Sequence, residues 1–95
     1  MNFVNEAVYY NAISSLKIGD TASAILNYKK VLEGNTLGHQ EKALIFLARI
    51  SFNSNDYEES NIYYDKLINI ASSNSIKRES LVRLMIASEH IDNVL

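Results

Sequence analysis

The chain has 95 residues, the size of one small domain, and no cysteine, which excludes disulfides, thiolate metal sites and a cysteine nucleophile. Its formal net charge of −2 provides no electrostatic basis for binding the phosphate backbone of a nucleic acid. The longest strongly apolar run, residues 43–48, is far shorter than the roughly 20 residues that span a bilayer, so we expect no membrane insertion.

Five segments of the chain have the periodicity of helices. Proline is absent, so glycine and clusters of Asn and Ser mark the breaks between elements, at 19–20, 34–38 and 53–55, with a softer break at 72–75. Between these breaks, apolar residues recur at helical spacing. The pattern predicts α-helices over about 2–18, 20–33, 39–52, 56–71 and 75–91. No run alternates between polar and apolar residues as a strand would, so the expected fold class is all-α.

The turns between these helices carry start and stop signals. Gly19 can adopt the left-handed conformation that ends a helix, and Asp20 can then cap the next one. Asp56, followed by Glu59, has the spacing of a capping box with the aspartate as the cap. We interpret Gly34 and Gly38 as punctuation of a loop.

The first two predicted helices resemble the next two. A shift of 36 residues pairs Ala7 with Ala43, Ala12 with Ala48, Ser15 with Ser51, Asp20 with Asp56, Tyr28 with Tyr64 and Lys30 with Lys66. A shift of 37 residues pairs Leu44 with Leu81, Leu47 with Leu84 and Ser51 with Ser88. Two helical hairpins and the first helix of a third copy therefore follow one another along the chain. A plain helical bundle is the alternative, but it offers no reason for this echo.

This pattern resembles the tetratricopeptide repeat (TPR) family, a helix–turn–helix repeated about every 34 residues. The family's small slots hold Ala12 and Ala24 in the first copy and Ala48 and Ser60 in the second, and its aromatic slot holds Tyr28 and Tyr64. Both turns are close to the family's Gly-Asp-Tyr. The chain departs from the family at the early aromatic position, which holds Val8 and Leu44, and it lacks the closing proline.

The resemblance implies antiparallel helical hairpins stacked as a short right-handed solenoid of about five helices. One domain would cover 1–95, with repeats over about 5–35 and 41–71 and a closing helix over about 75–91. Small residues where helices cross let the backbones approach to the short end of the 8–10 Å range, so we expect the six slot residues to pack the repeats.

In TPR proteins the first helix of each hairpin lines a concave face that binds a protein or peptide. By resemblance, the groove here would be lined by Tyr9, Ile13, Leu16, Lys17, Ile45, Arg49, Phe52, Val82 and Ile86. Its mixture of apolar, aromatic and charged side chains suits protein recognition. Only Arg83 agrees with the basic cluster with which some family members hold a peptide's terminal carboxylate, so no such clamp is expected.

Nothing in the sequence points to catalysis or to a cofactor. His39 and His90 lack partners at metal-ligand spacing, and we interpret both as surface histidines. No glycine-rich phosphate-binding motif occurs. The prediction is a non-enzymatic scaffold that binds a protein or peptide, with no catalytic residue, no metal and no cofactor.

The last predicted helix is too apolar for the exposed end of a stack. Residues 81–86 read Leu-Val-Arg-Leu-Met-Ile, whereas a terminal repeat helix should be polar on its outer side. The alternative function is therefore a self-associating piece of a longer solenoid, with a homodimer formed through the C-terminal helix. The compartment stays open: the cytoplasm is favoured, with the periplasm or cell envelope as alternatives. The abundance of Asn, Ile and Lys is typical of AT-rich bacterial coding.

Overall fold

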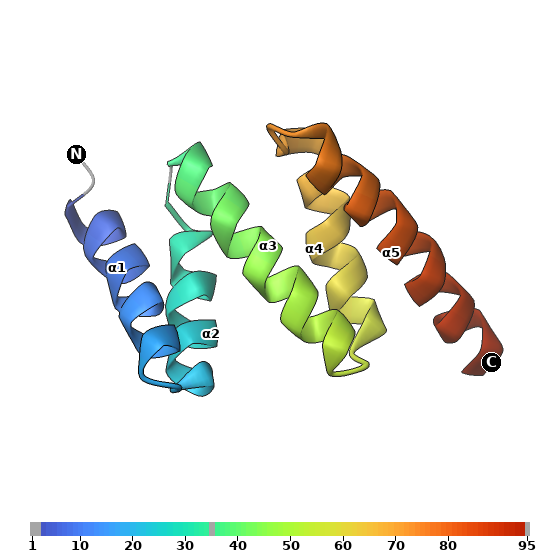
Figure 1. Ribbon diagram of the computed structural model, residues 1–95, viewed down its shortest axis with the longest axis horizontal. Coiled ribbons are helices and arrows are strands. Elements are labelled where there is room, and N and C mark those ends of the chain that lie inside the picture. Colours follow the sequence, from blue (N-terminus) through green and yellow to red (C-terminus); the bar gives the residue numbers. More distant parts are fainter. Residues whose placement is uncertain (1–2, 35, 95) are drawn as a thin grey trace. The chain divides into compact units, whose positions relative to one another are not determined.

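The computed structural model describes residues 3–34 and 36–94, and these residues form five α-helices and no strand (Figure 1). The helices are α1 (Phe3–Lys17), α2 (Thr21–Val31), α3 (Leu37–Asn53), α4 (Tyr57–Ile70) and α5 (Asn74–Val94). The all-α prediction is confirmed. Because each break is encoded locally by glycine or by Asn and Ser, the predicted helix ends lie within three residues of the observed ones.

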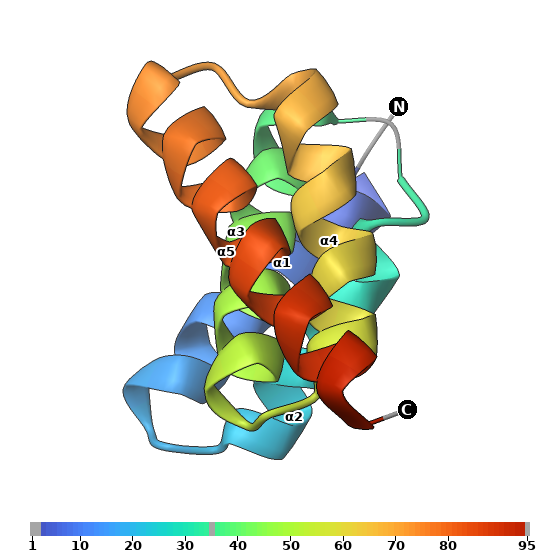
Figure 2. The ribbon, with the colours of Figure 1, turned by 90° about the vertical axis from the view of Figure 1, so that its right-hand side faces the viewer.

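The chain divides into two compact units, Met1–Ala43 and Leu44–Leu95. Unit 1 holds α1, α2 and the first turns of α3. Unit 2 holds the remainder of α3 together with α4 and α5. In unit 1, α1 packs against α2, and in unit 2, α4 packs against α5. The two helices of each packed pair run in opposite directions, and α4 and α5 lie side by side (Figures 1 and 2).

The turn between α1 and α2 is built as the sequence predicts. Gly19 has a φ of 82°, in the left-handed region that favours glycine. Asp20 caps α2, because its side chain accepts a hydrogen bond from the Ser23 N–H. The Asp20 N–H donates to the Ser15 carbonyl at 2.8 Å and ties the turn to the end of α1.

The turn between α3 and α4 repeats this geometry 36 residues later. Asn55 takes the place of Gly19 with a φ of 65°, and Asn is one of the few other residues that adopt this conformation readily. Asp56 caps α4 with φ −89° and ψ 75°, against φ −88° and ψ 79° at Asp20. Its N–H donates to the Ser51 carbonyl at 2.9 Å. The sequence echo is therefore matched by similar backbone geometry.

Of the two hydrogen bonds of the capping box predicted at Asp56, only the one to the Asp56 carboxylate forms. The Asp56 carboxylate accepts from the Glu59 N–H at 3.4 Å. The Glu59 carboxylate accepts instead from the Tyr63 hydroxyl at 3.0 Å, one turn further along α4. The Asp56 N–H, which a complete box would bind, is already bonded to Ser51.

Gly38 differs from the prediction, which placed it in a loop. It lies in the first turn of α3, where a helix tolerates glycine at a modest cost. Nearby, the Gln40 side-chain amide donates to the carbonyls of Leu32 and Gly34, which close the end of α2. The helix therefore begins two residues before its predicted start. Asn35 lies outside the described residues.

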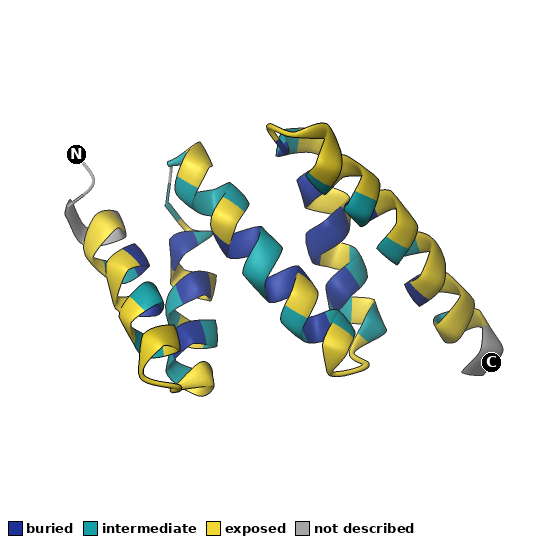
Figure 3. Ribbon diagram, in the orientation of Figure 1, coloured by how far each residue is buried: buried dark blue, intermediate teal, exposed yellow. Residues whose placement is uncertain are grey.

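The slot residues taken from the repeat pattern are buried in both units (Figure 3). Ala12, Ala24, Ala48 and Ser60 have no exposed surface, while Tyr28 and Tyr64 keep 6% and 1%. The buried Ser60 hydroxyl donates to the Tyr57 carbonyl at 3.0 Å, so its polar group is satisfied inside the helix. Ser80 in α5 does the same with the Ile76 carbonyl at 2.8 Å.

Substitution of Gly19 and of Gly38 by alanine provides a matched pair of variants that tests the geometry of the turn between α1 and α2. We expect Gly19→Ala to lower the free energy of unfolding by about 1–2 kcal/mol, because its positive φ strains any residue with a Cβ. Gly38→Ala should raise the free energy of unfolding by up to about 1 kcal/mol, because that site is helical and nothing lies within 4 Å of the added methyl. Urea unfolding followed by circular dichroism measures both. Equal effects of the two substitutions would contradict the assigned turn.

Candidate functional site

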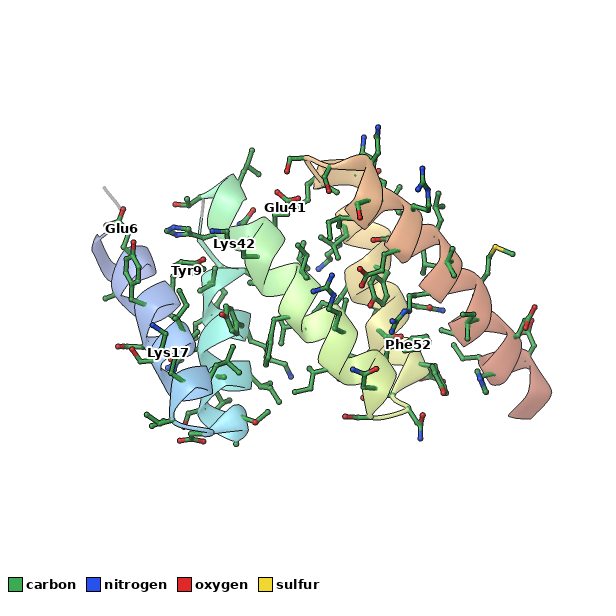
Figure 4. All side chains as sticks on the ribbon, in the orientation of Figure 1. Glu6, Tyr9, Lys17, Glu41, Lys42 and Phe52 are labelled. Atoms are coloured by element: carbon green, nitrogen blue, oxygen red, sulfur yellow. The ribbon has the colours of Figure 1, made fainter. Side chains whose placement is uncertain are left out.

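Tyr9 belongs to an aromatic cluster inside unit 1. Its ring stacks on His39 with centroids 4.0 Å apart and an interplanar angle of 4°. The edges of Tyr10 and Tyr28 meet it at centroid distances of 5.5 and 6.4 Å. The Lys42 ammonium lies 5.9 Å from the centroid of the Tyr9 ring (Figure 4). Only 6% of Tyr9 is exposed, so the structure gives this predicted groove residue the role of a core side chain.

The other residues predicted on α1 remain accessible. Ile13 is half-buried, and Leu16 and Lys17 are exposed. They therefore form an ordinary amphipathic helix surface.

Unit 2 brings charged side chains from α3 and α5 together. The Arg49 guanidinium donates two hydrogen bonds to Glu79, from Nε to Oε2 at 2.9 Å and from Nη2 to Oε1 at 2.8 Å. The Tyr64 hydroxyl of α4 donates to the same Oε2 at 3.2 Å. A bidentate pair of this kind fixes the direction of the arginine as well as its charge. The Glu79 carboxylate of α5 thus connects this helix to both α3 and α4.

The surroundings of this network shift the pKa values of Glu79 and Tyr64. The hydrogen bonds from Arg49 hold the pKa of Glu79 below its ordinary value. Burial, with the nearby Glu79 charge, raises the pKa of Tyr64 to about 12. The Tyr64 hydroxyl therefore keeps its proton at neutral pH and remains a donor to Glu79.

Phe52 lies beside this network. The Arg83 guanidinium carbon is 4.4 Å from the centroid of the Phe52 ring, within the range of a cation–π contact. The rings of Tyr57 and Tyr64 meet Phe52 edge-on at 5.4 and 6.5 Å. We call this surface the α3/α5 face and define it by Ile45, Arg49, Phe52, Glu79 and Arg83.

Within the α3/α5 face, accessibility varies by residue. Arg49 keeps 50% of its side-chain surface exposed, whereas Glu79 beneath it keeps 23%. Ile45, Phe52 and Arg83 are half-buried. Three of the predicted groove residues, Ile45, Arg49 and Phe52, therefore belong to one partly exposed surface.

The predicted groove residues Val82 and Ile86 lie on α5. Both are exposed, and they share an apolar stripe on α5 with Leu81 and Met85. Glu79 and Arg83 of the same helix contact Arg49 and Phe52 of α3. Sequence reasoning missed the Arg49–Glu79 pair, because no local signal connects residues 30 positions apart.

Of the two histidines predicted at the surface, His90 is exposed as expected and His39 is half-buried. His39 is half-buried against Tyr9, and its Nδ1 is buried without a hydrogen-bond partner. His90 is exposed, but its ring stacks on Tyr57 with centroids 4.4 Å apart. Each ring packs on a tyrosine of another helix, which the sequence spacing could not indicate.

The part of the chain that the structure describes contains neither a metal-binding cluster nor a membrane-spanning helix. Across residues 3–34 and 36–94, no three or more histidine and carboxylate side chains gather in a way that could hold a metal ion. Within the same residues, no helix combines the length and apolarity needed to cross a bilayer.

Comparison of the chain with family models, with curated proteins and with solved structures gave no match.

The Glu79 network makes stability depend on acidity. Because the folded-state pKa of Glu79 is depressed, its contribution is complete above pH 4.5 and is lost as the pH falls through the folded-state value. We expect Glu79→Gln to cost about 1 kcal/mol of unfolding free energy at pH 7, since the pair is partly exposed. That difference should shrink on acidification. Chemical unfolding across pH measures it, with Glu33→Gln as the control, and a pH-independent difference for Glu79→Gln would refute it.

Proposed function

We propose that the chain is a non-enzymatic protein-interaction scaffold with TPR-like hairpins, and that it binds a peptide or a helix on the α3/α5 face. The observation that carries this proposal is the exposed, prearranged Arg49 next to Phe52 and Arg83. Arginine and aromatic side chains are the residue types that contribute most to binding at protein interfaces.

Prearrangement favours binding at this face. Arg49 is held by two hydrogen bonds and still exposes half of its side chain, so little conformational freedom remains to be lost when a partner docks. Phe52 is fixed by its contacts with Arg83, Tyr57 and Tyr64. A rigid apolar ring beside a rigid cation is the arrangement expected of an anchor site.

The charges of the face indicate the chemistry of the partner. Arg49 and Arg83 are positive, and Glu79 supplies one negative charge against them. The excess positive charge favours a segment with an acidic side chain close to an apolar one. The segment would meet Phe52 with the apolar group and the arginines with the carboxylate.

The TPR-like part of the proposal is supported by the paired turns and slots. Gly19–Asp20 and Asn55–Asp56 have similar geometry, and the slot residues of both copies are buried. A repeated hairpin presents the first helix of each copy on the same side, which is the usual way in which such repeats create a binding surface.

A peptide-display selection on the immobilised protein tests the binding face. Selected peptides should bind Arg49→Gln at least about tenfold more weakly, because a central arginine contact is worth more than 1.4 kcal/mol. Lys66→Gln removes an equal charge from an exposed position on α4 and should change affinity less than about twofold. Fluorescence anisotropy measures both affinities. Equal losses in the two variants would contradict binding at the α3/α5 face.

A further inference from the structure

An apolar stripe runs along α5, and no other helix among the described residues of unit 2 covers it. Leu81, Val82, Met85 and Ile86 expose 54%, 49%, 67% and 38% of their surfaces. Their spacing places them on one side of the helix. Ser80 and Ala87, which are fully buried, lie on the side that packs within unit 2. Large apolar groups gathered on one exposed stripe mark an interaction surface.

Under the shift of 37 residues, two positions of this stripe correspond to buried positions of α3. Leu81 and Met85 match Leu44 and Ala48 of α3, which expose 3% and 0%. At the slot where Ala12 and Ala48 allow a close helix crossing, α5 carries Met85. A methionine there would keep a second helix from approaching to the hairpin distance. A looser, side-by-side helix pair accommodates the flexible thioether readily.

The charges at the two ends of the stripe complement each other. Arg78 and Glu89 are exposed, and with Val82 and Met85 they follow the four-three-four spacing of a coiled-coil seam. Both the apolar stripe and this charge pair are centred between residues 83 and 84. A two-fold axis at that point would set Arg78 of one copy opposite Glu89 of the other. Val82 would then lie opposite Met85.

We propose that two copies of this chain associate through α5 in antiparallel orientation, by way of this self-complementary seam. A two-fold interface uses the same patch on both copies, as the symmetric placement of charges here requires. A parallel pairing would set Arg78 against Arg78 and Glu89 against Glu89, which like-charge repulsion disfavours. Since four apolar side chains from each copy form the contact, the interface is small and the dimer dissociates on dilution.

Sedimentation equilibrium of the intact 95-residue chain tests the association. The weight-average mass should rise toward that of a dimer as concentration increases from about 10 µM to about 1 mM. Met85→Lys should keep the chain monomeric over this range, while Ile62→Lys, at an exposed apolar position of α4, should leave the association unchanged. A monomeric wild type, or an equal effect of both variants, overturns the proposal. Circular dichroism confirms that both variants keep their helices.

A charge exchange tests the orientation. Arg78→Glu and Glu89→Arg should each weaken the dimer about tenfold, because each places like charges together at both ends of the seam. The double variant R78E/E89R restores opposite charges and should recover the wild-type dissociation constant. Additive weakening in the double variant would exclude the antiparallel register. Because Arg49 and Phe52 lie outside the seam, failure of this proposal is separate from failure of peptide binding at the α3/α5 face.

Discussion

The complete burial of residues without bulky side chains at matching positions of both units is the constraint on which the rest of the structure depends. Ala12 and Ala24 in unit 1, and Ala48 and Ser60 in unit 2, are completely withdrawn from solvent. Where two such residues meet, backbones can approach to the short end of the usual packing range. The left-handed residue and capping aspartate of each turn then reverse the chain so that this contact can form.

Larger side chains pack around these small buried residues and connect the helices of unit 2. Tyr64, which is almost fully buried, reaches Glu79 with its hydroxyl and thereby connects α4 to the Arg49 pair. The same ring supports Phe52, on which Arg83 lies. Packing and surface chemistry are thus coupled in unit 2, because one tyrosine stabilises the hairpin and orients the charged face.

The helices and turns were predictable because their signals are local. Gly19, Asp20 and Asp56 act on neighbouring backbone groups, and the 36-residue echo identified equivalent positions without any knowledge of tertiary structure. The candidate site was predictable only in part. The burial of Tyr9 under His39 and the pairing of Arg49 with Glu79 depend on contacts between helices distant in sequence. The prediction placed Gly38 in a loop, whereas it lies in the first turn of α3. A glycine is tolerated in both settings, so the sequence does not distinguish them.

The most direct measurement of the central claim compares Ala24→Phe with Ala22→Phe on the same helix. Ala24 is fully buried and Ala22 is exposed, so the two variants share the intrinsic helix cost of phenylalanine and differ in the crossing alone. In urea unfolding, the small-residue crossing predicts that Ala24→Phe loses about 1–3 kcal/mol more stability than Ala22→Phe. Equal stability of the two variants would show that the helices do not depend on a close contact at this position.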